Sequence, residues 1–129
     1  LHKKQSGGAG QFGRVIGVLE PLTGEQNTQL FFKDETSGTR LPKNYVPSIR
    51  TGFELACASG GYLIGQPVVG VRFRLQDGDH HAVDSSDWSF QLATMGAMRD
   101  GTQTFIDTIA LIIFQVFHRN SSIMLVLIL

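Results

Sequence analysis

The sequence predicts one α+β domain in which helices cover one face of a sheet. Three observations support this fold class. Two runs rich in β-branched and large apolar residues, 14–22 and 29–34, are closed by turn residues, as strands are. Apolar residues recur at helical spacing after Pro42 and again after residue 87, and an alternating segment, 69–76, lies between them. At 129 residues, 42% of them apolar, the chain can bury one core.

The first two elements are strands. Residues 14–22 read Arg-Val-Ile-Gly-Val-Leu-Glu-Pro-Leu, and Pro21 with Thr23-Gly24 closes the run. Residues 29–34 have the same character and stop at the Thr-Ser-Gly-Thr turn. We expect the second strand to run antiparallel to the first.

A helix follows Pro42. Its apolar residues recur at spacings of three and four and therefore share one face: Val46, Ile49, Phe53, and Ala56 or Cys57. Arg50 and Glu54 form an i, i+4 pair on another face, and Gly60-Gly61 ends the helix. Cys57 is the only cysteine, which excludes an internal disulfide and a multi-cysteine zinc site, and we expect it to be buried.

The third strand has one buried face. Its apolar positions are Val69, Val71, Phe73 and Leu75. They alternate with Gly70, Arg72, Arg74 and Gln76, so the outer face is predicted to be basic.

A second helix follows. Asp84 or Ser85 is expected to cap it, and Asp87 favours its first turn electrostatically. The apolar stripe predicted to pack on the sheet consists of Trp88, Leu92 and Met95, with Phe90, Ala93 and Ala97 beside it. Trp88 is therefore predicted to lie in the core, like Phe53, Phe73 and Met95.

The tail from residue 101 onward is strongly apolar at 109–117 and 123–129, with polar interruptions. Neither run reaches the roughly 20 residues that span a bilayer, so no membrane partner is expected. A tail anchor is the alternative. We expect instead that 101–129 do not belong to the folded domain, since an exposed stretch this apolar favours aggregation.

The charge is balanced but unevenly placed. Eleven Lys and Arg offset eleven Asp and Glu, which excludes a bulk electrostatic attraction to nucleic acid. Residues 1–14 carry Lys3, Lys4 and Arg14 without a carboxylate, whereas 77–87 carry four aspartates without Lys or Arg. Any attraction to RNA must therefore be local.

The first candidate loop is the glycine-rich segment 2–13, which fits two functions. Gly8 to Gly13 match G-x-G-x-x-G, but they lead into a strand, whereas a dinucleotide site needs a helix there. The plain alternative is a hairpin connection. The functional alternative is an RNA-contacting loop, in which Lys3 and Lys4 supply charge, Gln5 and Ser6 supply hydrogen bonds, and the glycines allow backbone contact.

His80-His81 open the second candidate loop, 77–86. Adjacent histidines lack the i, i+4 spacing that brings two imidazoles onto one ion, so no metal is predicted. An acid–base dyad of His81 with Asp84 is a second hypothesis, but no nucleophile or oxyanion motif accompanies it. The plain alternative is an exposed loop histidine.

Both loops lie in segments that resemble domain IV of translation elongation factor G. These are HKKQSGGAGQFGRVIGVLEPL, LPKNYVPSIRTGFELACASG and LIGQPVVGVRFRLQDGDHHAVDSSDWSFQLATMGAMRD, within residues 2 to about 100. The K-Q-S-G-G-x-G-Q-[FY]-G and D-G-x-x-H-x-V-D-S-S loops occur in the family's order and at its separation. The opening, the two histidines and RLQDG are more similar to mitochondrial members than to typical bacterial ones.

The resemblance implies a fold like the second domain of ribosomal protein S5, with a left-handed β-α-β crossover and helices on one face of a mixed sheet. It implies a domain IV-like unit at 1–100, with its first strand truncated, and a non-family tail at 101–129. In the family this domain reaches the decoding centre of the small ribosomal subunit and helps to move tRNA and mRNA during GTP-dependent translocation. GTP and Mg²⁺ belong to the parent's GTPase domain; this chain lacks G-x-x-x-x-G-K-[ST], so neither catalysis nor a cofactor is expected in it.

The family's tip residues carry over position by position. The first tip loop falls on 5–11, and the tip histidine falls on His81. The RNA- or ribosome-contacting residues implied are Lys4, Gln5, Ser6, Gly7, Gly8, Ala9, Gly10, Gln11, Asp79, His80 and His81. Residues 84–86 would brace the loop by capping the helix.

The implied location is the mitochondrial matrix, with a bacterial cytoplasm as the alternative, and the implied partners are the ribosome, tRNA, mRNA and the other domains of the parent factor. Two rival functions remain open. One is a free-standing, S5-like RNA-binding or ribosomal protein. The other is an enzyme of a related two-domain fold that uses His81.

Overall fold

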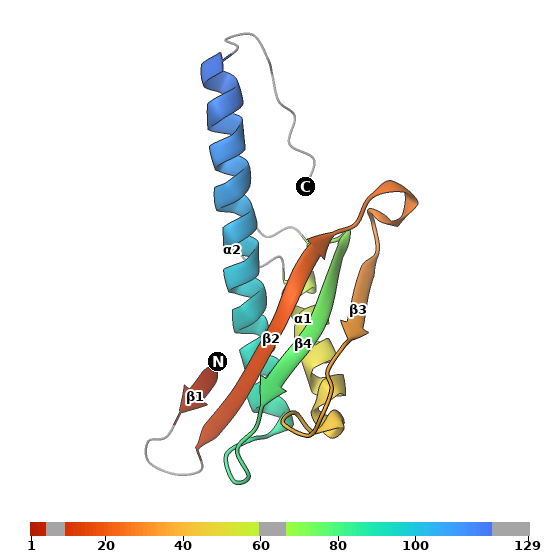
Figure 1. The fold of residues 1–129 in the computed structure, drawn as a ribbon, viewed down its shortest axis with the longest axis vertical. Coiled ribbons are helices and arrows are strands. Elements are labelled where there is room, and N and C mark those ends of the chain that lie inside the picture. Colours follow the sequence, from red (N-terminus) through yellow and green to blue (C-terminus); the bar gives the residue numbers. More distant parts are fainter. Residues whose placement is uncertain (5–9, 60–66, 120–129) are drawn as a thin grey trace.

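The computed structural model describes residues 1–4, 10–59 and 67–119, and it has one sheet with two helices packed on it (Figure 1). The strands are β1 (His2–Lys4), β2 (Gln11–Pro21), β3 (Leu30–Asp34) and β4 (Val71–Asp79). The helices are α1 (Val46–Ala58) and α2 (Asp87–Arg119), and two short 3-10 turns lie at Gly24–Gln26 and Lys43–Tyr45. The predicted α+β class is confirmed.

The sheet has the order β1-β2-β4-β3. β2 and β4 form its long antiparallel centre, from Arg14 opposite Asp79 to Pro21 opposite Val71, and β3 pairs with β4 in parallel. β3 therefore runs antiparallel to β2, as expected, but the two are not neighbours because β4 lies between them. Residues His2–Lys4, expected to belong to the first loop, instead pair with β2 as an edge strand.

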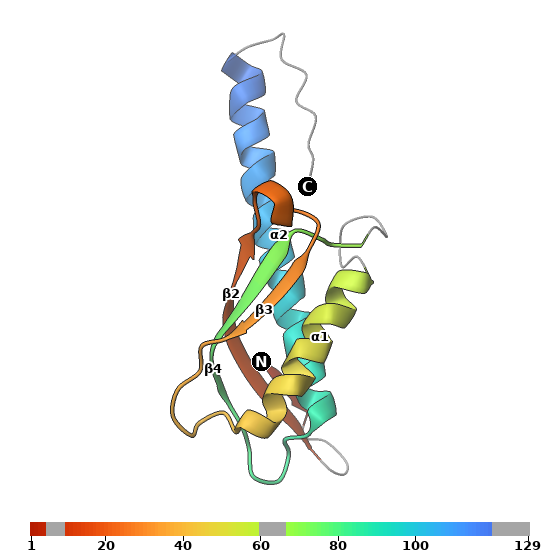
Figure 2. The same cartoon turned by 90° about the vertical axis from the view of Figure 1, so that its right-hand side faces the viewer.

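The connection from β3 through α1 to β4 joins two parallel neighbouring strands. Figures 1 and 2 show both helices on the same face of the sheet, so the other face stays open. Viewed from the helices with β3 and β4 pointing upward, β4 lies to the left of β3, which makes the crossover left-handed. Such crossovers are rare, since nearly all βαβ connections are right-handed.

The core lies between the sheet and the helices. Its most buried large side chains are Ile49, Phe53, Leu75 and Phe90. The rings of Phe32, Phe53 and Phe73 stack across it, with centroids 5.8–6.2 Å apart. The predicted apolar face of α1 is confirmed, since Ile49, Phe53, Ala56 and Cys57 are all buried. Burial raises the pKa of the Cys57 thiol to about 11, with a smaller contribution from Glu54, so the thiol stays protonated near neutral pH.

Two predictions for α2 were wrong. Trp88 is 54% exposed rather than buried, because Phe90 and Ala93 set the face that packs on the core and positions two apart on a helix point to nearly opposite sides. The cap is Ser86 rather than Asp84 or Ser85. The hydroxyl oxygen of Ser86 accepts the backbone N–H of Ser89, and the hydroxyl oxygen of Ser89 accepts the N–H of Ser86, in a reciprocal capping box.

The alternation predicted a basic outer face for β4. In the structure the arginines of this face are paired with glutamates. Arg74 binds Glu20 on β2 and Glu35 just after β3, and Arg72 also reaches Glu20 at 3.5 Å. These ion pairs link three strands on the open face of the sheet. The hydrogen bonds from Arg74 hold the pKa of both glutamates below the ordinary value of 4.5, against a smaller opposing effect of burial.

α2 continues past the end of the sheet (Figure 1). Thr102 is still buried, and Gly101 lies against Leu19 of β2. Gly60-Gly61, expected to end α1, lie outside the described residues; the last helical residue is Ala58. Within the described ranges, no helix is long and apolar enough to cross a membrane. The boundary placed at residue 100 stays a prediction.

Gly52 marks the closest approach of the two helices. A Cβ atom at this position would lie 2.8 Å from the carbonyl oxygen of Gln91 on α2, a backbone atom that cannot rotate away. We expect Gly52→Ala to push the helices apart and to lower the free energy of unfolding by about 1–3 kcal/mol, measured by urea denaturation.

Gly96, in the middle of α2, is the matched control. No atom lies within 4 Å of a Cβ built there. Gly96→Ala should therefore raise stability by roughly 0.5–1 kcal/mol, because alanine favours the helix over glycine. Equal effects of the two substitutions would contradict the close packing at Gly52.

The ion pairs of Arg74 should make stability depend on pH. The pKa values of Glu20 and Glu35 are lowered in the folded protein, so their stabilising contribution is present above 4.5 and is lost as the pH falls through their folded pKa values. We expect Arg74→Met to be less stable than the wild type at neutral pH, and the difference to shrink below about pH 4.5. Thermal unfolding over a pH series measures this; a difference that stays constant with pH would exclude the ion pairs as its cause.

Candidate functional site

The start of β2, where the first candidate loop joins the sheet, and the loop between β4 and α2 lie at the same end of the molecule, opposite the projecting end of α2 (Figure 1). Gln5, Ser6, Gly7, Gly8 and Ala9 lie outside the described residues, and Lys4 is the last residue of β1. Gly10 and Gln11, which follow them, are described. We call this end, formed by residues 10–12, 36–42 and 79–86, the tip.

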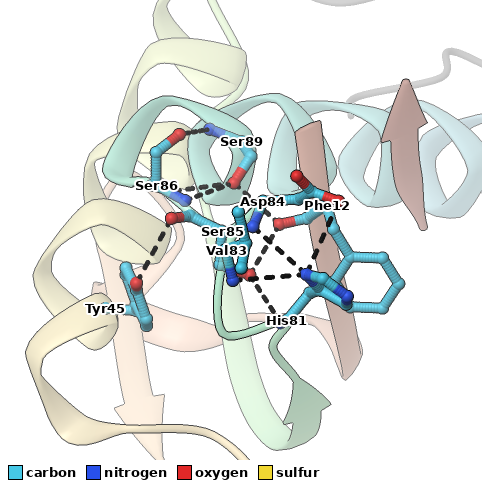
Figure 3. A network of polar contacts seen from close by, with 8 residues as sticks. All are labelled: Phe12, Tyr45, His81, Val83, Asp84, Ser85, Ser86 and Ser89. Atoms are coloured by element: carbon cyan, nitrogen blue, oxygen red, sulfur yellow. Dashed lines mark hydrogen bonds and ion pairs between the residues drawn. The ribbon is translucent and has the colours of Figure 1, made fainter. Parts of the chain in front are cut away.

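Phe12 joins the two loops through its backbone (Figure 3). Its N–H donates to the carbonyl oxygen of Asp84 at 2.9 Å. Its carbonyl oxygen accepts the hydroxyls of Ser85, at 2.9 Å, and Ser89, at 2.8 Å. Ser89 is fully buried, so its hydroxyl is shielded from water. The beginning of β2 and the 81–86 loop are therefore held as one unit.

Gly10 permits this close approach. A Cβ atom at Gly10 would lie 2.7–2.8 Å from the carboxylate atoms of Asp84, which is itself only 14% exposed. A side chain here would force the first loop away from the second. The motif glycine at position 10 thus has a packing role, in addition to the RNA contact implied by the resemblance.

Gln11 also anchors the first loop. Its side-chain oxygen lies 2.6 Å from Nε2 of His2, across the β1–β2 pair, where Lys4 stands opposite Gln11. The two strands are therefore tied together directly at the point where the residues of the first loop leave the sheet.

His81 is held by the backbone of its own loop. Nδ1 accepts the N–H groups of Val83, at 3.3 Å, and Asp84, at 3.2 Å, and the ring lies tilted against Phe12 at 6.2 Å. An acceptor at Nδ1 leaves the ring proton on Nε2. The half-exposed ring can therefore offer an N–H donor and a flat face to a partner.

Asp84 does not form a catalytic dyad with this histidine. Its carboxylate is 3.5 Å from Nδ1, the atom that already accepts two amide hydrogens. The carboxylate and the two amide groups therefore contact the same ring nitrogen. The contacts of Nδ1 position the ring within the loop and do not activate it as a base.

His80 is bound elsewhere. Its Nδ1 lies 2.8 Å from the carbonyl oxygen of Arg40, and its backbone N–H donates to the carboxylate of Asp79. The two neighbouring imidazoles therefore serve different partners and do not converge on one point. In the described part of the chain, no group of three or more metal-ligating side chains is found.

Residues 36–42 form a third part of the tip, which was not predicted from the sequence. The guanidinium of Arg40 pairs with Asp77 at 3.3 Å and Asp79 at 3.7 Å. Lys43 holds this loop by donating to the carboxylate of Asp34 and to the carbonyl and hydroxyl oxygens of Thr36. Burial raises the pKa of Asp34, but its hydrogen bonds from Lys43 and Thr36 outweigh this effect and lower the pKa overall.

The acidic segment 77–87 is consequently compensated within the tip. Arg40 pairs with Asp77 and Asp79, and Asp87 accepts the hydroxyl of Ser48 on α1 at 2.7 Å. Asp84 is held in the 81–86 loop. The sequence alone did not reveal the partner of Asp77 and Asp79. Arg40 is 37 residues from Asp77 along the chain and becomes its neighbour only through the crossover.

The family of the chain is established by comparison with known proteins. A sequence model described as "Elongation factor G, domain IV" matches residues 1–104. The chain belongs to the elongation factor G family. The domain IV unit that it contains includes the strands, α1 and the part of α2 that packs on the sheet.

Relatives and a solved structure agree with this assignment. Proteins named "Elongation factor G, mitochondrial" from Drosophila mojavensis and Drosophila melanogaster are 55% identical over 100 residues, which is 78% of this chain and 13% of each relative. A crystal structure of a protein from Thermus thermophilus superposes with a TM-score of 0.64 at 37% identity, covering 73% of this chain and 13% of that one. The chain thus spans about an eighth of the length of these relatives.

The bonds at Phe12 make a specific prediction for Ser85. Its hydroxyl accepts the N–H of His81 and donates to the carbonyl of Phe12, so Ser85→Ala leaves both backbone groups without this partner. We expect a loss of about 1–3 kcal/mol in the free energy of unfolding and faster amide hydrogen exchange at His81 and Phe12.

Ser37→Ala is the control. It makes the same chemical change, the loss of a serine hydroxyl, at an exposed position in the 36–42 loop. It should leave both measurements within experimental error. Unchanged exchange at His81 in Ser85→Ala would show that the serine does not hold the loop.

Proposed function

We propose that this chain is the ribosome-contacting domain IV of a mitochondrial elongation factor G, and that its tip assists GTP-dependent translocation of tRNA and mRNA. The observation that carries the proposal is the junction of the two motif loops through Phe12, which makes them a single surface at one end of the domain. Membership of the elongation factor G family supports the assignment.

The proposed contacts suit RNA bound to the small subunit. His81 offers an Nε2–H donor and a ring face, both of which bind unpaired nucleotides without a net positive charge. Lys4, at the end of β1, and the glycine-rich residues 5–11 supply a cation and accessible backbone N–H groups for phosphates. Asp79 and His80 belong to the same proposed surface; both are linked to Arg40.

The proposed location and partners follow from the relatives. They are named mitochondrial, and we infer that this chain acts in the mitochondrial matrix on the decoding centre of the small ribosomal subunit. GTP and Mg²⁺ would be bound by the GTPase domain of the full-length factor. In this proposal domain IV binds RNA and performs no chemistry.

A free-standing RNA-binding protein is the alternative, and salt-dependent binding to naked RNA would favour it. Such a protein binds naked RNA in a strongly salt-dependent way, because counterion release drives its association. A chain with zero net charge and internally paired aspartates at its tip has little of that driving force. The translocation factor, which is brought to the ribosome by its other domains, does not need it.

The test concerns His81 in a full-length elongation factor G that carries this domain. We expect His81→Ala to slow translocation roughly tenfold, since losing one contact worth about 1.4 kcal/mol in the transition state changes a rate by that factor. Ribosome-stimulated GTP hydrolysis should remain nearly unchanged. Stopped-flow measurement of mRNA movement and of phosphate release separates the two.

His81→Gln is the matched variant, because glutamine keeps an N–H donor but loses the ring. It should retain more translocation activity than alanine if the donor matters. An equal loss of translocation and GTP hydrolysis in His81→Ala would contradict the role given to the tip.

A further inference from the structure

Trp88 follows the tip residues 79–86 in the chain, and the fold does not explain its exposure. It is the second residue of α2, directly after the cap that closes the 81–86 loop. Its side chain is 54% exposed, and Val83 in the adjoining loop is 83% exposed, whereas Ser89 and Phe90, which follow it, are completely buried. Large aromatic side chains are mostly covered in folded proteins, so an exposed indole beside a candidate binding surface calls for a partner.

The phenylalanine and tyrosine side chains that the structure describes, all before residue 105, each have a ring or cation partner. Phe32, Phe53 and Phe73 stack in the core, Tyr45 contacts Phe90, Phe12 contacts His81, and Arg72 lies over Phe31. Within this part of the chain, Trp88 alone has no such contact. About half of its surface is therefore accessible to a molecule from outside.

We propose that Trp88 stacks on an unpaired nucleobase of ribosome-bound RNA and is thus a further RNA-contacting residue of the tip. The inference rests on the proposed function, and adds to it a position that neither motif loop contains. Stacking on an aromatic face is tolerant of base identity because every base has such a face. It requires neither a cation nor a fixed sequence.

The charges around Trp88 favour a base over a phosphate. Asp87 precedes it in the helix, and Asp84 lies in the loop below, each with its own protein partner. Carboxylates repel a phosphate at this position but leave the indole face open to a base. A second copy of the chain or another protein could also contact residue 88, through an apolar side chain. Such a contact would accept leucine at this position, whereas stacking on a base needs an aromatic ring.

The single tryptophan of the chain reports on its own contact. The complete 129-residue chain is titrated with purified mitochondrial small ribosomal subunits, while binding is measured by co-sedimentation and the Trp88 environment by fluorescence. We expect binding to quench the fluorescence. Trp88→Ala should weaken binding roughly tenfold, Trp88→Phe should keep most of the affinity, and Trp88→Leu should behave like alanine, because stacking needs a ring.

Leu55→Ala is the matched control, since Leu55 is 46% exposed on α1 and its truncation removes a comparable apolar group outside the tip. It should bind like the wild type. Circular dichroism of all variants verifies that the exposed substitutions leave the fold intact.

The outcomes separate this inference from the proposed function. Binding that is unaffected by Trp88→Ala and unaccompanied by quenching overturns the stacking role and leaves the proposed function standing. Affinity restored by leucine as well as by phenylalanine points to a protein partner, and also overturns it. A wild-type chain that fails to bind the subunit also overturns the stacking role, whereas the proposed function is tested separately by His81→Ala in the full-length factor.

Discussion

The backbone of Phe12 is the point on which the candidate site depends. Its N–H and carbonyl groups are both bound by the 84–89 segment, through one backbone carbonyl and two serine hydroxyls. A backbone group buried without a partner would cost about 1–3 kcal/mol, so each of these bonds resists separation of the two loops. Because the bonds link the start of β2 to the start of α2, they also fix the tip relative to the core. The loops can then present their side chains on a pre-ordered surface, which lowers the entropy lost on binding.

Much of the fold could be predicted from the sequence because hydrophobic periodicity is a local signal. Ile49 and Phe53 repeat with the helix, and Phe73 and Leu75 alternate with the strand, and all four are buried. Trp88 was misplaced for the same reason: periodicity identifies an apolar residue but not which stripe of a helix faces the sheet. The order of the strands depends on the crossover, a non-local feature, and so the position of β4 between β2 and β3 could not be read from the runs alone.

The candidate site was less accessible to sequence reasoning than the fold. The two motif loops could be found, since glycine and histidine mark them, and in the structure Phe12, which follows the first loop, is bonded to the second. Arg40 could not be found. Nothing in its own neighbourhood distinguishes it from any other exposed arginine, and its role at the tip arises only when the left-handed connection brings 36–42 beside Asp77 and Asp79.

Internal pairing of the tip charges has a consequence for how such a surface can work. A tip that carried unpaired lysines and arginines would bind any exposed phosphate backbone, and its affinity would be dominated by counterion release. Here Arg40 is already engaged by two aspartates, and Nδ1 of His81 accepts two amide hydrogens. The groups to which we assign RNA contacts are directional instead: the imidazole N–H of His81, the backbone of the glycine-rich segment and the indole of Trp88. Directional groups discriminate between nucleotides by position and lose their contacts when the nucleotides move, which suits the role in translocation that we propose for this domain.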